Sequence, residues 1–232
     1  MPFSLARRAV FYRETATGMY SITAYVIADS LVELPYTLFQ TIFGVSIVYM
    51  MIGFNSNIVA VLFYYSNAFC LVLLLTYMGL LFSWLLPDAL SAQLSAISFI
   101  QVLQIFSGVL VPAQDLAKGF KPFYWASPYR WSIECQVGTQ FHNDQTPICV
   151  PFGLPAHGPL VEKAHLCTSD GSSDFEKVTG ILMTAEDFVM KEFLPDFRYD
   201  RRYWDMLFLV CWILGARVFT VIAMSFINHN KR

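Results

Sequence analysis

Residues 58–86 read IVAVLFYYSNAFCLVLLLTYMGLLFSWLL and contain no charged side chain. A helix of about 20 mostly apolar residues is enough to cross the hydrocarbon core of a bilayer. This stretch is longer than that, so it can tilt or project beyond the membrane. The sequence therefore predicts a membrane-spanning helix over residues 58–86.

Three further stretches have the length and apolar character of membrane spans. They are residues 35–54, which continue a helix that begins near Tyr20, residues 89–111, and residues 204–227. The connections at 55–57 and 87–88 are short, so the first three helices should be antiparallel neighbours. We therefore expect an all-α membrane protein, with three transmembrane helices in residues 21–112 and a fourth in residues 204–232.

The bulk composition agrees with a membrane protein. Hydrophobic residues make up 56% of the chain and charged residues 14%, with a mean hydropathy of +0.51. Average soluble domains contain about 25% charged residues. The net charge of −2 argues against nucleic acid as a partner, because no basic stripe is present to neutralise phosphates.

Basic residues at the two ends of the chain predict its orientation. Arg7, Arg8 and Arg13 precede the first span, and Lys231 and Arg232 follow the last. Because short cytoplasmic flanks are rich in Lys and Arg, we expect both termini in the cytoplasm. Residues 1–20 then form a cytoplasmic segment, and residues 113–203 lie outside the cell.

The outer segment begins with an aromatic stretch that is too short and polar to span the bilayer. Residues 120–141 read FKPFYWASPYRWSIECQVGTQF and are interrupted by Pro122 and Pro128. Such a stretch is typical of a re-entrant or interfacial hairpin, which is tolerated where protein or water covers its backbone. Residues 142–180 are polar and loop-like, and a short capped helix is expected after Thr184.

Two cysteines lie in this outer segment, at positions 149 and 167. If the segment is extracytoplasmic, a disulfide bond between Cys149 and Cys167 is compatible with that compartment. His157 and His165 lie in the same loop, but no tight ligand spacing recurs, so no metal site is predicted.

The third span carries an unusual number of polar side chains: Ser91, Gln93, Ser95, Ser98, Gln101, Gln104 and Ser107. Side chains like these are costly in hydrocarbon unless they face other helices or a watery cavity. Two interpretations remain open, namely helix–helix packing and a translocation path. The size of the glutamines favours the path.

Charged residues also occur in or beside the spans. Arg217 lies well inside the last span, where it can pair with Glu33 or Asp29 or extend toward the interface. Asp29 and Glu33 stand one helical turn apart, as exposed carboxylates on a cytoplasmic extension or as a proton relay. The motifs GxxxxGK[ST], HExxH, GxSxG and CxxC are absent, so the sequence predicts no enzymatic activity for this chain by itself.

Several fragments resemble one transporter family in their order and spacing. They are RAVFYRE (8–14), GMYS (18–21), ELPY (33–36), FSGVLVP (106–112), SPYRW (127–131) and FINHNKR (226–232). Together they resemble the membrane domain of G-subfamily ABC transporters, of the pleiotropic-drug-resistance type. Members of that family carry a nucleotide-binding domain and six membrane helices per half, so this chain resembles only the C-terminal part.

The resemblance implies the membrane portion of an ATP-driven exporter, with an amphipathic lipid, sterol, terpenoid or xenobiotic as substrate. It implies a nucleotide-binding domain and a second membrane half as partners. ATP and Mg²⁺ would bind that nucleotide-binding domain, and no cofactor would bind this chain. The implied location is the plasma membrane. The alternative is a truncated, non-transporting protein that associates with full-length transporters.

The resemblance also implies roles for individual residues. Coupling to the ATPase domain would fall to Arg8, Arg13 and Glu14. The residues of the substrate path would be Thr37, Ile100, Gln101 and Gln104, and the apolar gate would be formed by Val109 and Leu110. The Gln side chains stand where many drug exporters of the family have aromatic or Met residues.

The orientation of the chain can be tested with epitope tags in intact cells. We expect tags at both termini to be protected from external protease and a tag near Gly171 to be accessible, because the basic residues lie at the two ends. A C-terminal tag that is cleaved from outside would overturn the even number of spans.

Overall fold

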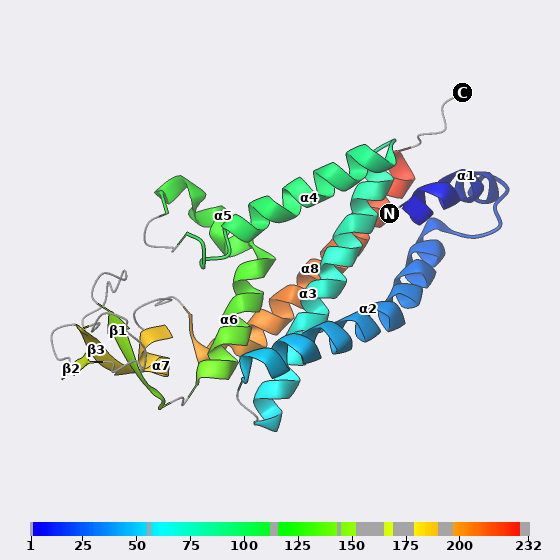
Figure 1. The fold of residues 1–232 in the computed structure, drawn as a ribbon. Coiled ribbons are helices and arrows are strands. Elements are labelled where there is room, and N and C mark those ends of the chain that lie inside the picture. Colours follow the sequence, from blue (N-terminus) through cyan, green and yellow to red (C-terminus); the bar gives the residue numbers. More distant parts are fainter. Residues whose placement is uncertain are drawn as a thin grey trace.

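The computed structural model describes residues 2–54, 57–111, 116–142, 145–151, 165–168, 179–189 and 197–227. The helices are α1 (Pro2–Ala16), α2 (Ile22–Ile52), α3 (Ile58–Leu85), α4 (Ala89–Ile105), η1 (Lys118–Phe120), α5 (Lys121–Ala126), α6 (Pro128–Phe141), α7 (Ala185–Asp187), η4 (Tyr199–Arg201) and α8 (Arg202–Phe226). The strands are β1 (Pro147–Pro151), β2 (His165–Thr168) and β3 (Thr179–Thr184). Figure 1 shows long helices in a bundle, with the sheet at one end and α1 at the other.

The long helices begin and end at residues that satisfy their free backbone groups. The Ser21 hydroxyl accepts a hydrogen bond from the Ala24 amide at the start of α2. The Asn57 side chain does the same for Val59 at the start of α3. At the end of α2, Gly53 adopts a left-handed conformation with φ 71° and donates its amide to the Tyr49 carbonyl. These caps match the residue preferences at helix ends.

Three helical segments are long and apolar enough to cross a membrane, in the described part of the chain: Ile22–Ile52, Ile58–Leu85 and Tyr199–Phe226. They agree closely with three of the four predicted spans. The fourth prediction, residues 89–111, corresponds to α4, an apolar helix of only 17 residues. At 1.5 Å per residue α4 is about 25 Å long, which is short of the roughly 30 Å hydrocarbon core. The four-span count therefore stays a prediction.

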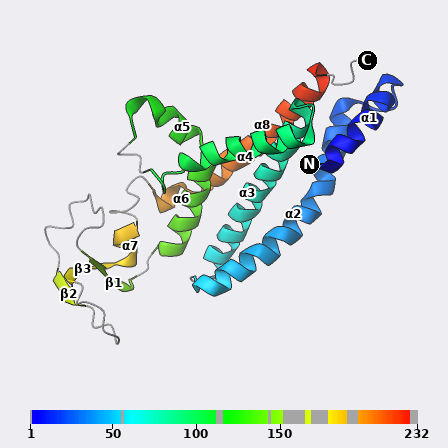
Figure 2. The ribbon, with the colours of Figure 1, turned by 45° about the horizontal axis from the view of Figure 1, so that its top comes forward.

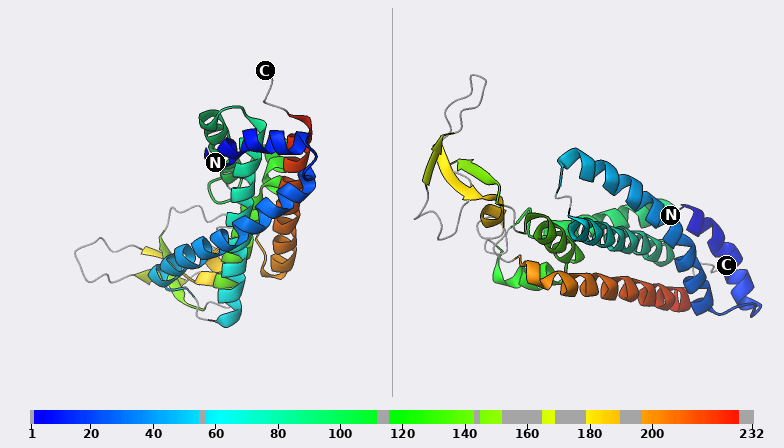
Figure 3. Two further views of the ribbon diagram at one scale, coloured as in Figure 1. Left: turned by 90° about the vertical axis from the view of Figure 1, so that its right-hand side faces the viewer. Right: turned by 90° about the horizontal axis from the view of Figure 1, so that it is seen from below.

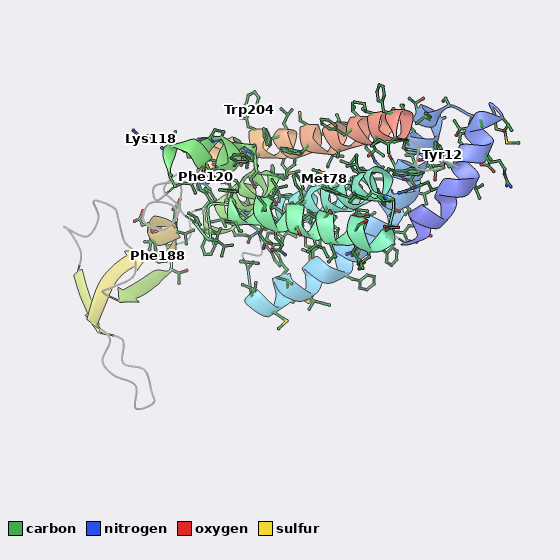
Figure 4. The ribbon with its side chains drawn as sticks, turned by 90° about the horizontal axis from the view of Figure 1, so that it is seen from above. Tyr12, Met78, Lys118, Phe120, Phe188 and Trp204 are labelled. Carbon is green, nitrogen blue, oxygen red and sulfur yellow. The ribbon has the colours of Figure 1, made fainter. Side chains whose placement is uncertain are left out.

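Helix α3 lies at the centre of the bundle and packs against α2, α4, α6 and α8. Its closest partner is α8, which runs beside it along the bundle (Figure 3). Leu74 of α3 and Leu209 of α8 are fully buried at their contact, and Met78 lies inside the bundle (Figure 4). Trp204 at the start of α8 points away from the bundle in the same view.

Small side chains allow α4 to approach α3 closely. Ala92 and Ala96 are almost completely buried, and the rings of Phe82 and Phe99 meet with centroids 5.5 Å apart. Within a bilayer, helices associate through such close packing, because lipid tails are as apolar as the side chains themselves. The packing of α4 on α3 therefore depends on shape rather than on removal of apolar surface from water.

The aromatic stretch after α4 folds into two helices that meet at Ser127. Pro122 and Pro128 lie in the first turns of α5 and α6, where the missing amide hydrogen of proline costs nothing. Helix α6 packs against α3 and α8, while Figure 4 shows Lys118 and Phe120 at the end of the bundle nearest the sheet. That this stretch re-enters the membrane remains a prediction.

The outer segment contains a small antiparallel sheet in the order β1-β3-β2, which the sequence analysis did not predict. Cys149 pairs with Leu182 and Cys167 with Gly180, so β3 separates the two cysteines. Strands two apart are roughly 9.6 Å from each other, whereas the Cα atoms of a disulfide lie about 4.4–6.8 Å apart. The cysteine side chains lie outside the described residues, and this backbone pairing does not support the predicted bridge. The expected cap after Thr184 is present, with the Asp187 amide donating to the Thr184 hydroxyl.

An aromatic cluster joins α1 to the ends of α2, α3 and α8. Phe11 is 2% exposed, and its ring lies 4.7 Å from that of Tyr25 and 5.1 Å from that of Trp84. Met224 of α8 completes the buried cluster, and the Tyr12 hydroxyl donates to the Ile227 carbonyl. Because α2, α3 and α8 all contribute side chains to this cluster, α1 packs firmly against the bundle.

Substitution of Phe11 tests how firmly α1 is held. Phe11→Ala should weaken the attachment by about 3 kcal/mol, because loss of a buried ring leaves a cavity. Trypsin should then cleave at Arg7 and Arg13 of the purified chain roughly a hundredfold faster, because cleavage follows the population of the opened state. Val10→Ala is the matched control, since Val10 is the preceding residue and is 43% exposed. Equal cleavage of the two variants would contradict the packing role of Phe11.

Candidate functional site

The predicted path residues on α4 differ in their exposure. Gln101 and Gln104 are both exposed, and Ile100 is half-buried. Neither glutamine side chain has a hydrogen bond partner in the described part of the chain. Polar amides thus project from an apolar helix on its uncovered side.

Thr37 lies elsewhere in the bundle. It is 2% exposed in α2, where the Thr41 hydroxyl donates to its carbonyl at 2.8 Å. Helix α2 packs on α3 and α8, whereas α4 packs on α3 and α6, and Figures 1 and 2 show α2 and α4 on different sides of α3. Within this chain the structure therefore does not bring Thr37 together with Gln101 and Gln104.

The predicted gate follows a sharp turn after α4. Ser107 and Gly108 are buried, whereas Val109 and Leu110 are 38% and 65% exposed. Gly108 has φ 91°, a conformation that favours glycine. A Cβ atom at Gly108 would lie 2.9 Å from the Tyr124 ring, so the turn also needs glycine for space. Val109 and Leu110, the predicted gate residues, lie in a turn that packs tightly against Tyr124 of α5. The helix therefore ends before the predicted boundary at 111.

The predicted intramembrane charge has a partner. The Arg217 guanidinium lies 3.7 Å from the Asp29 carboxylate, and its centre lies 3.5 Å above the Tyr77 ring. The Tyr77 hydroxyl donates to the Ser30 carbonyl, so α2, α3 and α8 are linked at this level. Glu33, the other candidate, is half-buried and makes no ion pair within the described residues. Of the partners that the sequence offered, the structure selects Asp29.

The predicted coupling residues have different surroundings. Arg8 is 7% exposed, and its guanidinium donates hydrogen bonds to the carbonyls of Ser83, Leu86 and Pro87 at the end of α3. A cation is favoured there, because the last carbonyls of a helix carry a partial negative charge. Arg8 therefore faces the bundle, and a direct contact of its charge with another domain would require it to leave this position.

Arg13 and Glu14 lie at the other side of α1. Arg13 is exposed, and Glu14 accepts a hydrogen bond from the Tyr20 hydroxyl at 2.9 Å. Burial and this hydrogen bond raise the pKa of Tyr20 to about 12, so the hydroxyl keeps its proton at neutral pH. With Arg7 and Val10, Arg13 forms an exposed face on α1 at helical spacing, and we call Arg7, Val10 and Arg13 the outer face of α1.

A cluster of buried charges was missed by the sequence analysis. Arg130, Glu134 and Asp205 have no exposed surface, and Arg201 contacts Glu134. The available signal was the spacing of Arg130 and Glu134, four residues apart in a helix, which allows an ion pair. Their stretch was noted only for its aromatic residues and prolines and for the SPYRW motif.

Known proteins similar to this chain share its membrane region. Residues 1–141 match the family described as ABC-2 type transporter. ABC transporter G family member 35 of Arabidopsis thaliana is 34% identical over 154 residues, which are 66% of this chain and 11% of that protein. Pleiotropic drug resistance protein 1 of Nicotiana tabacum is 33% identical over 147 residues, 63% of this chain and 10% of that protein.

A rice relative, ABC transporter G family member 42 of Oryza sativa subsp. japonica, is 31% identical over 65% of this chain and 10% of that protein. The chain thus spans about a tenth of the length of the curated relatives that it matches. The family match covers residues 1–141 of 232, more than half of the chain, and the chain therefore belongs to the ABC-2 type transporter family as a membrane domain of the G-family, pleiotropic-drug-resistance type.

Proposed function

We propose that this chain is the membrane-spanning part of an ATP-driven exporter that moves an amphipathic lipid, sterol, terpenoid or xenobiotic out of the cytoplasm. The observation that carries this proposal is the exposed pair Gln101 and Gln104 on the apolar helix α4. Amides that face lipid would be penalised, so this side of α4 should face a second membrane half across a wet cavity. A cavity with both apolar and amide walls suits an amphipathic substrate.

Energy would enter through α1. Its inner side is fixed by Phe11 and Arg8, and its outer face, Arg7, Val10 and Arg13, is exposed and would be covered by a nucleotide-binding domain that holds ATP and Mg²⁺. Movement of that domain would be passed to the ends of α2, α3 and α8, because the aromatic cluster connects all of them to α1. In this proposal Arg8 transmits force through α3, Arg13 contacts the domain, and Glu14 orients Tyr20.

Release would be controlled by the turn after α4. Val109 and Leu110 from two membrane halves would meet as an apolar constriction above the glutamines. Closure of the nucleotide-binding domains would compress the cavity and open this constriction, so that access alternates between two discrete states. Thr37, buried in the present arrangement, would line the path only if α2 moved relative to α3.

The alternative function is a truncated membrane protein that associates with full-length transporters without moving substrate.

The two functions differ in the ATPase activity that accompanies the chain. The test is to purify the tagged protein from its native membranes and measure vanadate-sensitive ATP hydrolysis with and without amphipathic compounds. An exporter should show hydrolysis that responds to substrate. An associated protein should lower or leave unchanged the activity of the transporter that it accompanies.

The glutamines and the gate should give different transport phenotypes. In the complete transporter, Gln104→Ala should change the ratio of transport rates between two substrates by about two- to tenfold, the effect of one hydrogen bond. Leu110→Ala should instead change turnover for all substrates alike, because it loosens a constriction that every substrate passes.

Val102→Ala is the control for these variants, because Val102 is an exposed apolar residue of α4 on a different side from Gln104. Transport of a panel of radiolabelled substrates into inverted vesicles provides the measurement. If Gln104→Ala and Leu110→Ala behave like Val102→Ala, α4 does not line the path and its glutamines serve only packing.

A further inference from the structure

A fully buried arginine lies at the end of the bundle that faces the sheet. The Arg130 guanidinium is 3.2 Å from the Glu134 carboxylate, and neither side chain has any exposed surface. Glu134 also pairs with Arg201 at 2.7 Å and accepts a hydrogen bond from the Arg198 amide at 2.9 Å. Removal of a charge from water is expensive, so a buried ion pair persists only where further contacts compensate it.

Aromatic rings supply the remaining contacts of Arg130. Its guanidinium centre lies 4.1 Å from the Trp125 ring, 4.4 Å from the Trp131 ring and 4.7 Å from the Tyr124 ring. The indole of Trp131 donates to the Trp125 carbonyl at 2.9 Å, which fixes two of the three rings relative to each other. Because a planar guanidinium can stack on several ring faces, arginine suits this position better than lysine.

One of these rings also contacts the turn that carries Val109 and Leu110. Tyr124 is 2% exposed, and its Cε2 atom would be 2.9 Å from a Cβ atom built at Gly108. The Tyr124 ring therefore has the guanidinium of Arg130 on one side and the backbone of the turn against it. A shift of the ring would change the space available to Gly108.

A second attachment holds the end of α4, just before the turn. The Ser127 hydroxyl donates to the Leu103 carbonyl at 2.7 Å, in the last turn of α4, and Ser127 is fully buried. Ser127 is the residue between α5 and α6, one position before the helix that carries Arg130. The end of α4 and the turn after it are thus held at two points, by Ser127 and by Tyr124.

We infer that Arg130 is a positioning residue for the turn 107–110, because together with Glu134 it holds the Tyr124 ring against which Gly108 packs. The positioning of the turn is inferred from the contacts alone. The inference rests on the proposed function only in taking the turn 107–110 as the gate of the transport path. Glu134 anchors α6 to Arg198 and Arg201, and it also holds Arg130. The stacked rings transfer the position of Arg130 to α5, and Tyr124 transfers it to the turn. Arg130 itself contacts no substrate, so its effect on transport is indirect.

The inference can be tested by hydrogen exchange of the chain in lipid nanodiscs. Arg130→Lys keeps the charge but loses the stacking plane, so the turn should open more often. We expect the amides of residues 107–110 to exchange about tenfold faster, a factor that corresponds to about 1.4 kcal/mol. Peptides from the centre of α3 should keep their exchange rates, which separates a local effect from a general loss of stability.

Arg202→Lys is the matched control. Arg202 stacks on Tyr199, Tyr203 and Phe63 near the same end of the molecule, at 3.9, 4.8 and 5.4 Å, so the chemistry of the substitution is the same. Exchange at 107–110 should be unchanged in this variant. Equal acceleration in the two variants would overturn the inference, as would unchanged exchange in Arg130→Lys.

A second variant decides the matter if Arg130→Lys does not fold. Tyr124→Leu leaves the ion pair intact and removes the ring that contacts Gly108, so it should also accelerate exchange at 107–110. If it leaves these amides as protected as in the unsubstituted chain, the inference is wrong. The measurement needs neither ATP nor substrate, so faster exchange without any change in transport would support the positioning role and count against the gate.

Discussion

The fold depends on the helix α3, because each of its sides is covered by a different helix. Helices α2, α4, α6 and α8 all pack against it, and the largest buried cluster joins its residues Leu74, Tyr77 and Met78 to Leu209 and Ala216 of α8. A helix that is apolar on all sides can be covered by protein or by lipid. The long helices around it expose large apolar side chains on their outer surfaces, which is the arrangement expected for a bundle in a bilayer.

Buried charges fix the bundle at three levels. Arg8 binds the carbonyls at one end of α3, Arg217 pairs with Asp29 beside Tyr77 of α3, and Arg130 pairs with Glu134 in α6, the helix that binds Asn67 of α3. The contacts of Arg8 and Arg217 join segments that are far apart in the sequence, whereas Arg130 and Glu134 lie on successive turns of one helix. Charges of this kind contribute little net stability, since desolvation offsets their attraction. We infer that these charges instead favour one arrangement, because another arrangement would leave a buried charge without a partner.

This distribution of charges suits a protein that must transmit movement between its ends. The joint of α1 lies near the start of α4, and the turn at 107–110 follows the opposite end of α4 (Figure 1). At one end Phe11 and Arg8 contact the end of α3, so in the proposed mechanism a displacement of α1 would displace α3. At the other end the Tyr124 ring and Gly108 leave little free space, so in the same proposal a small movement of α6 would shift the turn. Close packing makes such coupling discrete rather than gradual.

The sequence alone determined the bounds of α2, α3 and α8 to within a few residues, and the family of the chain. Those properties depend on local composition, namely length, hydropathy and capping residues, which act along a single helix. The tertiary structure decided that α4 ends at the Gly108 turn, that Arg217 takes Asp29 rather than Glu33, that Arg8 faces the bundle, and that Thr37 is separated from Gln101. The three-stranded sheet and the aromatic rings around Arg130 were likewise visible only in the tertiary structure. These outcomes depend on distances between segments far apart in the chain, and local composition carries no information about such distances.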